Sequence, residues 1–171
     1  MEAAGKEDGM TLSEQFVAEF DEEMKPTRRL LERVPSERGA WKPHQKSFAL
    51  GHLAQLVARM PGWITATLAA PVLDLTTFKG YSFEKTETLL EEFDRGVKEA
   101  RAALARATDA DFAQPWELTM GGRALMKLPR RVAIRQHINH LCHHRGQLTV
   151  YLRLIDVPVP SIYGPTADER M

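Results

Sequence analysis

Apolar residues near the start of the chain recur every four positions, at Leu12, Phe16, Phe20 and Met24. This spacing places them on one face of an α-helix. Thr11 and Glu14 fit a capping box, in which each side chain accepts a hydrogen bond from a backbone N–H at a helix start. The pattern predicts a first helix from about Thr11 to Val34. Residues 1–10 are small, charged and aperiodic, so we expect a flexible tail there.

A second helical repeat begins at Ser47 and carries Ala49, Leu53, Leu56, Met60 and Trp63 on one face. Pro61 and Gly62 fall inside this repeat. Proline lacks the backbone N–H that a helix interior needs, so we expect a kink or an interruption there. The second helix is therefore predicted to be continuous as far as Met60.

The second half of the chain predicts two more helices with a short irregular element between them. The apolar spacing indicates one helix over Ser82–Thr108, with Ser82 as its N-cap, and another over 129–157. Residues 114–127 contain paired glycines and predict a small hairpin or an ordered loop. Four helices joined by short or moderate connections predict an all-α, antiparallel four-helix bundle, in a single domain over residues 11–171.

The composition is that of a globular protein, with 43% hydrophobic and 27% charged residues. Lys plus Arg equals Asp plus Glu at 23 each, so no global positive charge would attract nucleic acid or anionic lipid. The single cysteine, Cys142, cannot form an intramolecular disulfide, and the N-terminus lacks the apolar core of a signal peptide. No apolar run approaches the ~20 residues of a membrane span. We expect a cytoplasmic protein that binds neither nucleic acid nor membrane.

Histidines are concentrated in the last predicted helix, where four of the six lie within residues 137–144. At about 100° per residue, His140 and His144 are only about 40° apart and one turn apart, so both rings can approach one point. This is a typical spacing for two metal ligands on a helix. His143 is predicted to point away from the core. Cys142 lies about 160° from His144, which argues against a cysteine–histidine catalytic pair.

A third ligand has to come from another helix, and His52 lies in the middle of the apolar face of the second one. Three neutral imidazoles suit zinc, nickel, copper, iron or cobalt and leave coordination positions open. The alternative is that these residues are hydrogen-bonded core histidines. His44 and His143 fit surface positions or positions next to the site, and His137 fits either core packing or a contact with a ligand.

Four segments carry a resemblance to a known family: WKP at 41–43, GHLAQL at 51–56, NHLCHHRGQLTVYLR at 139–153 and PVPSIYGP at 158–165. Together they make the chain similar to the DinB/YfiT-like family over residues 11–169. The resemblance implies a four-helix bundle, frequently a homodimer. It also implies one divalent metal ion on the histidine of the second helix and on two histidines four apart on the last, here His52, His140 and His144.

Two functions are compatible with this site. In the first, the ion activates a water or a low-molecular-weight thiol, as in a thiol transferase or a hydrolase, with Asn139, Gln147 or Tyr151 orienting the bound group or substrate. In the second, the protein is a non-catalytic, metal-stabilised dimer with a stress-response or interaction role. Zinc or nickel is the expected metal, with iron, cobalt, copper or manganese as alternatives.

Overall fold

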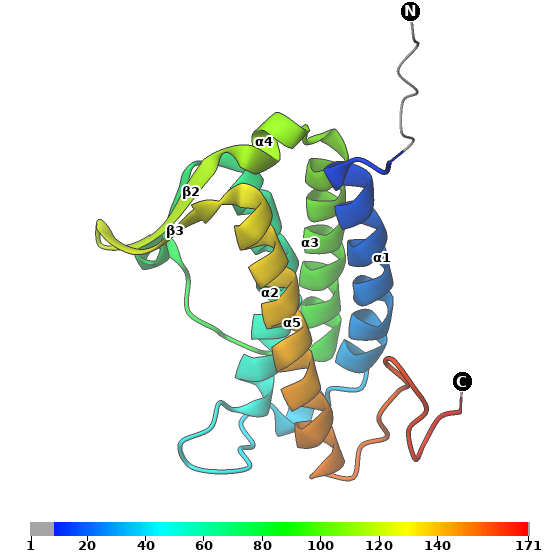
Figure 1. The fold of residues 1–171 in the computed structure, drawn as a ribbon. Coiled ribbons are helices and arrows are strands. Elements are labelled where there is room, and N and C mark those ends of the chain that lie inside the picture. Colours follow the sequence, from blue (N-terminus) through cyan, green and yellow to red (C-terminus); the bar gives the residue numbers. More distant parts are fainter. Residues whose placement is uncertain (1–8, 171) are drawn as a thin grey trace, which may run out of the picture.

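The computed structural model describes residues 9–170, and most of that part of the chain is helical (Figure 1). Residues 1–8 of the expected tail lie outside the described part. The described elements are five α-helices, α1 Leu12–Leu31, α2 Leu50–Ala69, α3 Thr86–Arg106, α4 Asp109–Ala113 and α5 Arg130–Arg153; two 3-10 turns, Ser36–Arg38 and Leu75–Thr77; and three strands, β1 Val72–Asp74, β2 Pro115–Met120 and β3 Arg123–Pro129. The fold is thus mostly helical, as expected, but a small three-stranded sheet accompanies the helices, so the all-α class holds only in part.

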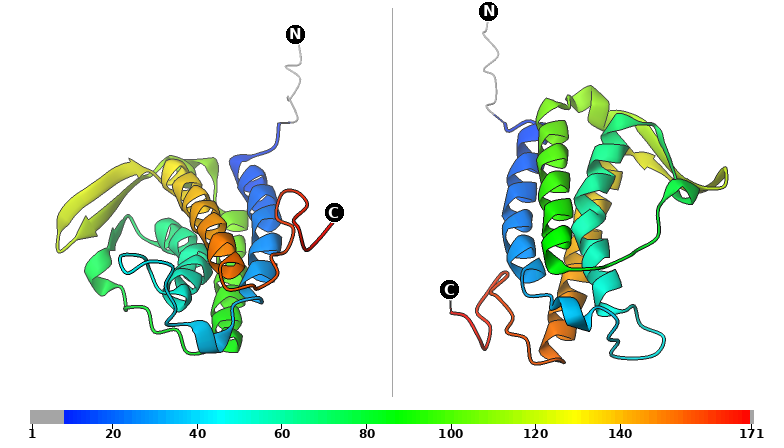
Figure 2. Two further views of the ribbon diagram at one scale, coloured as in Figure 1. Left: turned by 90° about the horizontal axis from the view of Figure 1, so that it is seen from below. Right: turned by 180° about the vertical axis from the view of Figure 1, so that it is seen from behind.

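The four long helices pack side by side around one hydrophobic core (Figures 1 and 2). α3 contacts α1 and α2, and α5 contacts α2 and α1. Short α4 leads from α3 into the hairpin of β2 and β3, which projects away from the helices. No helix in residues 9–170 is long and apolar enough to cross a membrane.

The predicted capping box of α1 is confirmed. The Glu14 backbone N–H donates to Thr11 Oγ1 at 3.2 Å, and the Thr11 N–H donates to Glu14 Oε2 at 2.8 Å. The predicted cap of α3 was wrong, because α3 begins at Thr86. Ser82 instead donates its backbone N–H to Gln55 Oε1 of α2 at 2.8 Å, which fixes the connecting segment against that helix.

Pro61 does not interrupt α2, which continues to Ala69. The missing N–H costs a helix interior about 3 kcal/mol when nothing offsets it. Here Pro61 is buried against α3. Gly96 of α3 lies next to it, so close that a Cβ atom added to Gly96 would be in van der Waals contact with Pro61 Cβ, at 3.6 Å. Tertiary packing therefore outweighs the local preference.

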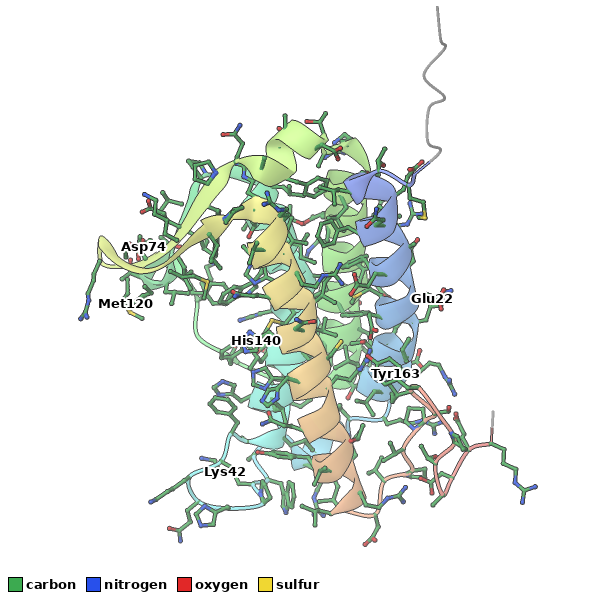
Figure 3. The ribbon with its side chains drawn as sticks, viewed as in Figure 1. Glu22, Lys42, Asp74, Met120, His140 and Tyr163 are labelled. Carbon is green, nitrogen blue, oxygen red and sulfur yellow. The ribbon has the colours of Figure 1, made fainter. Side chains whose placement is uncertain are left out.

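The predicted hairpin is present, but it belongs to a three-stranded sheet in the order β1-β2-β3. β2 and β3 are antiparallel, and β1 pairs with β2 in parallel. Asp74 in β1 accepts backbone N–H bonds from Gly121 at 3.2 Å and Gly122 at 3.1 Å, and a bond from Thr119 Oγ1 at 3.0 Å. Both glycines have positive φ, +58° and +79°, which the tight turn requires. One carboxylate thus joins β1 to the hairpin turn (Figure 3).

Candidate metal centre

α5 brings His140 and His144 together. Their Nε2 atoms lie 2.8 Å apart, and their ring centroids 4.5 Å apart. His144 is 8% exposed, whereas His140 lies on the exposed side of the helix. Figure 3 labels His140 at the middle of α5. The pair is therefore half-buried, with one side open to solvent.

A hydrogen bond joins His144 to Gln147, one turn further along α5. Gln147 Oε1 lies 2.7 Å from His144 Nδ1. A carbonyl oxygen can only accept, so Nδ1 must donate. Nε2 of a neutral His144 ring then has a free lone pair and accepts a hydrogen bond from His140 Nε2.

Both rings are held in the neutral form. Burial is the largest cause of the lowered pKa of His140, followed by the neighbouring His144 and His143. Burial also lowers the pKa of His144 and outweighs its bond to Gln147, which acts in the other direction. A histidine can ligate a metal only when neutral, so these shifts favour ligation at neutral pH.

His52 is not part of this pair. Its ring is stacked between Phe48 and Tyr81, with centroid distances of 4.3 Å and 4.2 Å. Burial, and then the charge of Lys42, lowers its pKa. Within residues 9–170, no three His, Cys, Asp or Glu side chains form a group that could hold a metal. The structure therefore brings together two of the three expected ligands, and the third stays a prediction.

Tyr151 also differs in position from expectation. It donates its hydroxyl hydrogen to the Phe48 carbonyl oxygen at 3.3 Å, and the edge of its ring packs on Trp41 at 5.8 Å. Tyr151 thus connects α5 to the loop before α2, which carries one of the two rings stacked on His52.

The other ring, Tyr81, belongs to a segment that Phe83 anchors. The Phe83 ring fits between two glycines: a Cβ built on Gly39 or on Gly51 would lie 2.5 Å from Phe83 Cδ1. Gly51 directly precedes His52. The absence of a side chain at these two positions therefore allows the 78–85 segment to lie against the start of α2.

The remaining histidines are separate from the pair. His137 is buried, with Nε2 3.0 Å from Thr67 Oγ1 and its ring 5.6 Å from both Trp63 and Trp116. Burial, with a smaller contribution from the nearby His140, lowers its pKa to about 4. His137 is thus a core histidine, whereas His44, Asn139 and His143 are exposed.

On another side of α5, a buried polar cluster was not predicted from the sequence. Arg145 is 1% exposed and forms an ion pair with Glu23 Oε2 at 2.6 Å. It also donates to Thr27 Oγ1 at 3.0 Å and to Tyr163 Oη at 2.6 Å. Cys142 faces Glu23 of α1 at 3.3 Å, and burial raises the pKa of its thiol. The thiol therefore stays protonated, and the cluster is better suited to binding the C-terminal segment than to catalysis.

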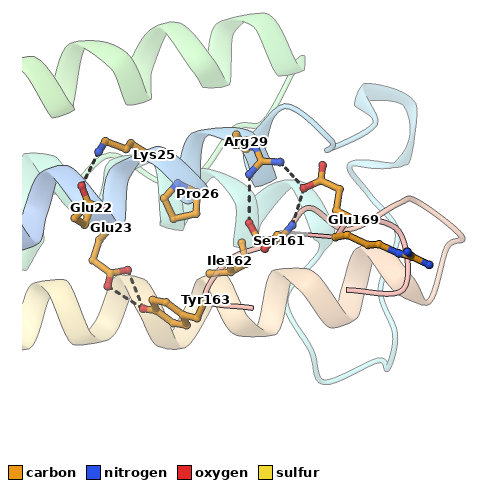
Figure 4. A pocket seen from close by; sticks show the side chains of 10 residues that line it. Glu22, Glu23, Lys25, Pro26, Arg29, Ser161, Ile162, Tyr163 and Glu169 are labelled. Atoms are coloured by element: carbon orange, nitrogen blue, oxygen red, sulfur yellow. Dashed lines mark hydrogen bonds and ion pairs between the residues drawn. The ribbon is translucent and has the colours of Figure 1, made fainter. Parts of the chain in front are cut away.

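A cavity of about 440 Å³ lies beside this cluster, between α1 and residues 161–170 (Figure 4). Tyr163 and Glu23 meet at one end of it, and Arg29 forms an ion pair with Glu169 at the other. Lys25 and Glu22 also line the cavity and pair with each other. Both acidic and basic side chains line the cavity, so it favours no ligand charge.

Comparisons with known proteins agree with the fold. The DinB family model matches residues 6–170. YrdA of Bacillus subtilis strain 168, an uncharacterized protein, is 24% identical over 158 residues, which cover 90% of this chain and 89% of YrdA. The crystal structure of a DinB-like protein of B. subtilis, YjoA, has a TM-score of 0.69 at 19% identity and covers 86% of this chain and 97% of YjoA. A DinB-like protein of Bacillus cereus ATCC 10987 has a TM-score of 0.68 at 23% identity, with 86% and 95% covered. The chain belongs to the DinB family.

Proposed function

We propose that this protein binds one divalent transition-metal ion on His140 and His144, with His52 as the third ligand, and uses it to activate a water or a low-molecular-weight thiol. The 2.8 Å approach of two neutral Nε2 atoms carries the proposal. Typical zinc–imidazole distances are about 2.0–2.1 Å, so two nitrogens this close can both contact one ion. Zinc and nickel fit best, and iron, cobalt, copper and manganese are alternatives.

The surroundings of the pair suit chemistry. Three protein ligands leave at least one position for solvent or substrate, and the exposed side of His140 faces solvent. When bound, such an ion lowers the pKa of a coordinated water or thiol and makes it a nucleophile near neutral pH. The chain holds the His144 ring through Gln147 and keeps both imidazoles neutral through burial.

Metal content measured on protein purified without a histidine tag tests the proposal. Alanine at His52, His140 or His144 should each strongly reduce the bound metal. His143→Ala is the matched control, because His143 is an exposed neighbour on the same helix, and it should retain the metal. Metal retained in two of the three ligand variants would refute the assignment of these histidines as the metal ligands.

A second experiment distinguishes an enzyme from a protein in which the metal is purely structural. With cobalt in the site, titration with a small thiol should change the visible absorption, because a thiolate entering the coordination sphere alters both geometry and charge-transfer bands. A cobalt protein without this response has a closed coordination sphere, and the thiol-activating function would then be abandoned.

A further inference from the structure

We infer that Gln147 is a positioning residue that presents Nε2 of His144 to the metal and keeps the other ring nitrogen protonated. The inference rests on the proposed metal site. From the sequence, Gln147 was expected to orient a bound group or the substrate. The 2.7 Å contact instead connects its carboxamide oxygen to His144 Nδ1. Gln147 therefore acts through a ligand and does not itself need to touch the substrate.

The contact selects one of two forms of the ring. A neutral imidazole carries one hydrogen, on Nδ1 or on Nε2, and only the bare nitrogen can bind a metal. Oε1 of Gln147 accepts and cannot donate, so it stabilises the form with the hydrogen on Nδ1. The Nε2 lone pair of His144 then points at His140 Nε2, 2.8 Å away. The ring is thus prepared for ligation before any metal arrives.

Burial does not force this contact, because the Gln147 side chain is exposed and could be solvated instead. Both residues lie within the 24-residue helix α5, three positions apart, so the backbone fixes their relative position. Within the described part of the chain, the hydrogen bond of the His140 ring is to His144 itself. His144 is therefore the anchored member of the pair, and His140 is the freer one.

The acceptor is an amide and carries no charge. Metal-binding histidines often donate their second N–H to a carboxylate, which fixes the ring but also makes the ligand more basic. The Gln147 amide fixes the ring without adding negative charge beside the ion. If an ion binds here, this uncharged partner of His144 would leave it more positive charge to act on a coordinated water or thiol.

Metal-free protein gives the first test. Long-range ¹H–¹⁵N NMR correlations of ¹⁵N-histidine-labelled protein report which nitrogen of His144 carries the hydrogen. We expect Nδ1–H in wild type and in Gln147→Glu, which preserves an acceptor, and a mixture of both forms in Gln147→Ala. Gln136→Ala, an exposed glutamine on the same helix, is the control and should match wild type. An unchanged His144 tautomer in Gln147→Ala would overturn the inference.

Zinc binding by calorimetry gives the second test. Removal of a hydrogen-bond partner of a ligand typically weakens metal binding about 10- to 100-fold, so we expect this loss in Gln147→Ala. Gln147→Glu should bind at least as tightly as wild type, because a carboxylate restores the contact and adds charge. Equal affinities of Gln147→Ala and wild type would contradict the positioning role. Wild-type protein that binds no zinc or other divalent ion would refute the proposed function itself, whatever the tautomer.

Discussion

Replacing Gly51 by alanine should destabilise the fold through a contact 32 positions away in sequence. The added Cβ would lie 2.5 Å, 2.6 Å and 2.7 Å from three carbon atoms of Phe83. Carbon atoms in contact normally lie about 3.5–4.0 Å apart, so the ring must move by about 1 Å. It cannot move freely toward the loop, because Gly39 flanks the same ring equally closely.

The expected size of the effect follows from two opposing contributions. Overpacking a well-packed site costs about 1–3 kcal/mol, while alanine in a helix gains about 0.5–1 kcal/mol over glycine. The net loss should be about 1–2 kcal/mol. For a chain of this size, about 2–4 °C of Tm corresponds to each kcal/mol, so Tm should fall by roughly 2–8 °C.

Thermal melts followed by circular dichroism measure this effect against a matched control. Gly62→Ala changes the same helix where nothing lies within 4 Å of the new Cβ, and it should raise Tm slightly. In the Gly51→Ala background, Phe83→Leu should recover part of the loss, whereas Phe83→Leu alone should be destabilising. If Gly51→Ala is as stable as wild type, or if the two substitutions prove additive, the close packing of Phe83 on Gly51 is refuted.

Three further predictions concern the buried and charged groups of the fold. Because burial lowers the pKa of His137 to about 4, the unfolded chain binds more protons between about pH 6.5 and 4. As the pH is lowered over that range, the free energy of unfolding should therefore fall by roughly 3 kcal/mol. The fall should be smaller in His137→Gln, and urea titrations at each pH measure both. Arg145→Ala removes a buried ion-pair partner and should lower the free energy of unfolding by about 3–5 kcal/mol. Arg153→Ala removes an exposed one and should lower it by only about 0–1 kcal/mol. Equal losses in urea titrations of the two variants would contradict this. Hydrogen bonds lower the pKa of Asp74, so its carboxylate should stay ionised below the ordinary titration range of carboxyl groups and keep its bond to the Gly122 N–H. Hydrogen exchange of the Gly122 amide should therefore stay slow there and become fast in Asp74→Ala.

The helices could be predicted from the sequence wherever a local signal determines them. The capping box at Thr11 and the apolar repeat of α1 both lie within neighbouring turns, and both predictions were correct. Pro61 of α2 is buried where α3 passes it at Gly96, and Ser82 is bound to Gln55 of α2. Such contacts between distant positions leave no periodic pattern. The three-residue strand β1 was missed for the same reason, because it exists only through its pairing with β2.

The same distinction applies to the candidate site. The pairing of His140 with His144 follows from helical geometry alone, and the structure brings the two rings together. Whether His52 joins them depends on the loop that carries Phe48 and on the segment that carries Tyr81. The burial of Arg145 was equally hidden, because its partners come from α1 and the C-terminal segment. A charged residue next to the paired histidines gives no local sign that it is enclosed.

The parallel pairing of β1 with β2 has a consequence for the order of folding. The chain between these strands passes through α3 and α4, so the pairing closes a loop of more than 40 residues. A long loop loses conformational entropy on closure, and the loss is smaller once α3 already packs against α2. We therefore expect the sheet to form after the folding transition state. Kinetically, substitutions in β1 should speed unfolding and leave the folding rate nearly unchanged, whereas a slower folding rate would place the sheet in the nucleus.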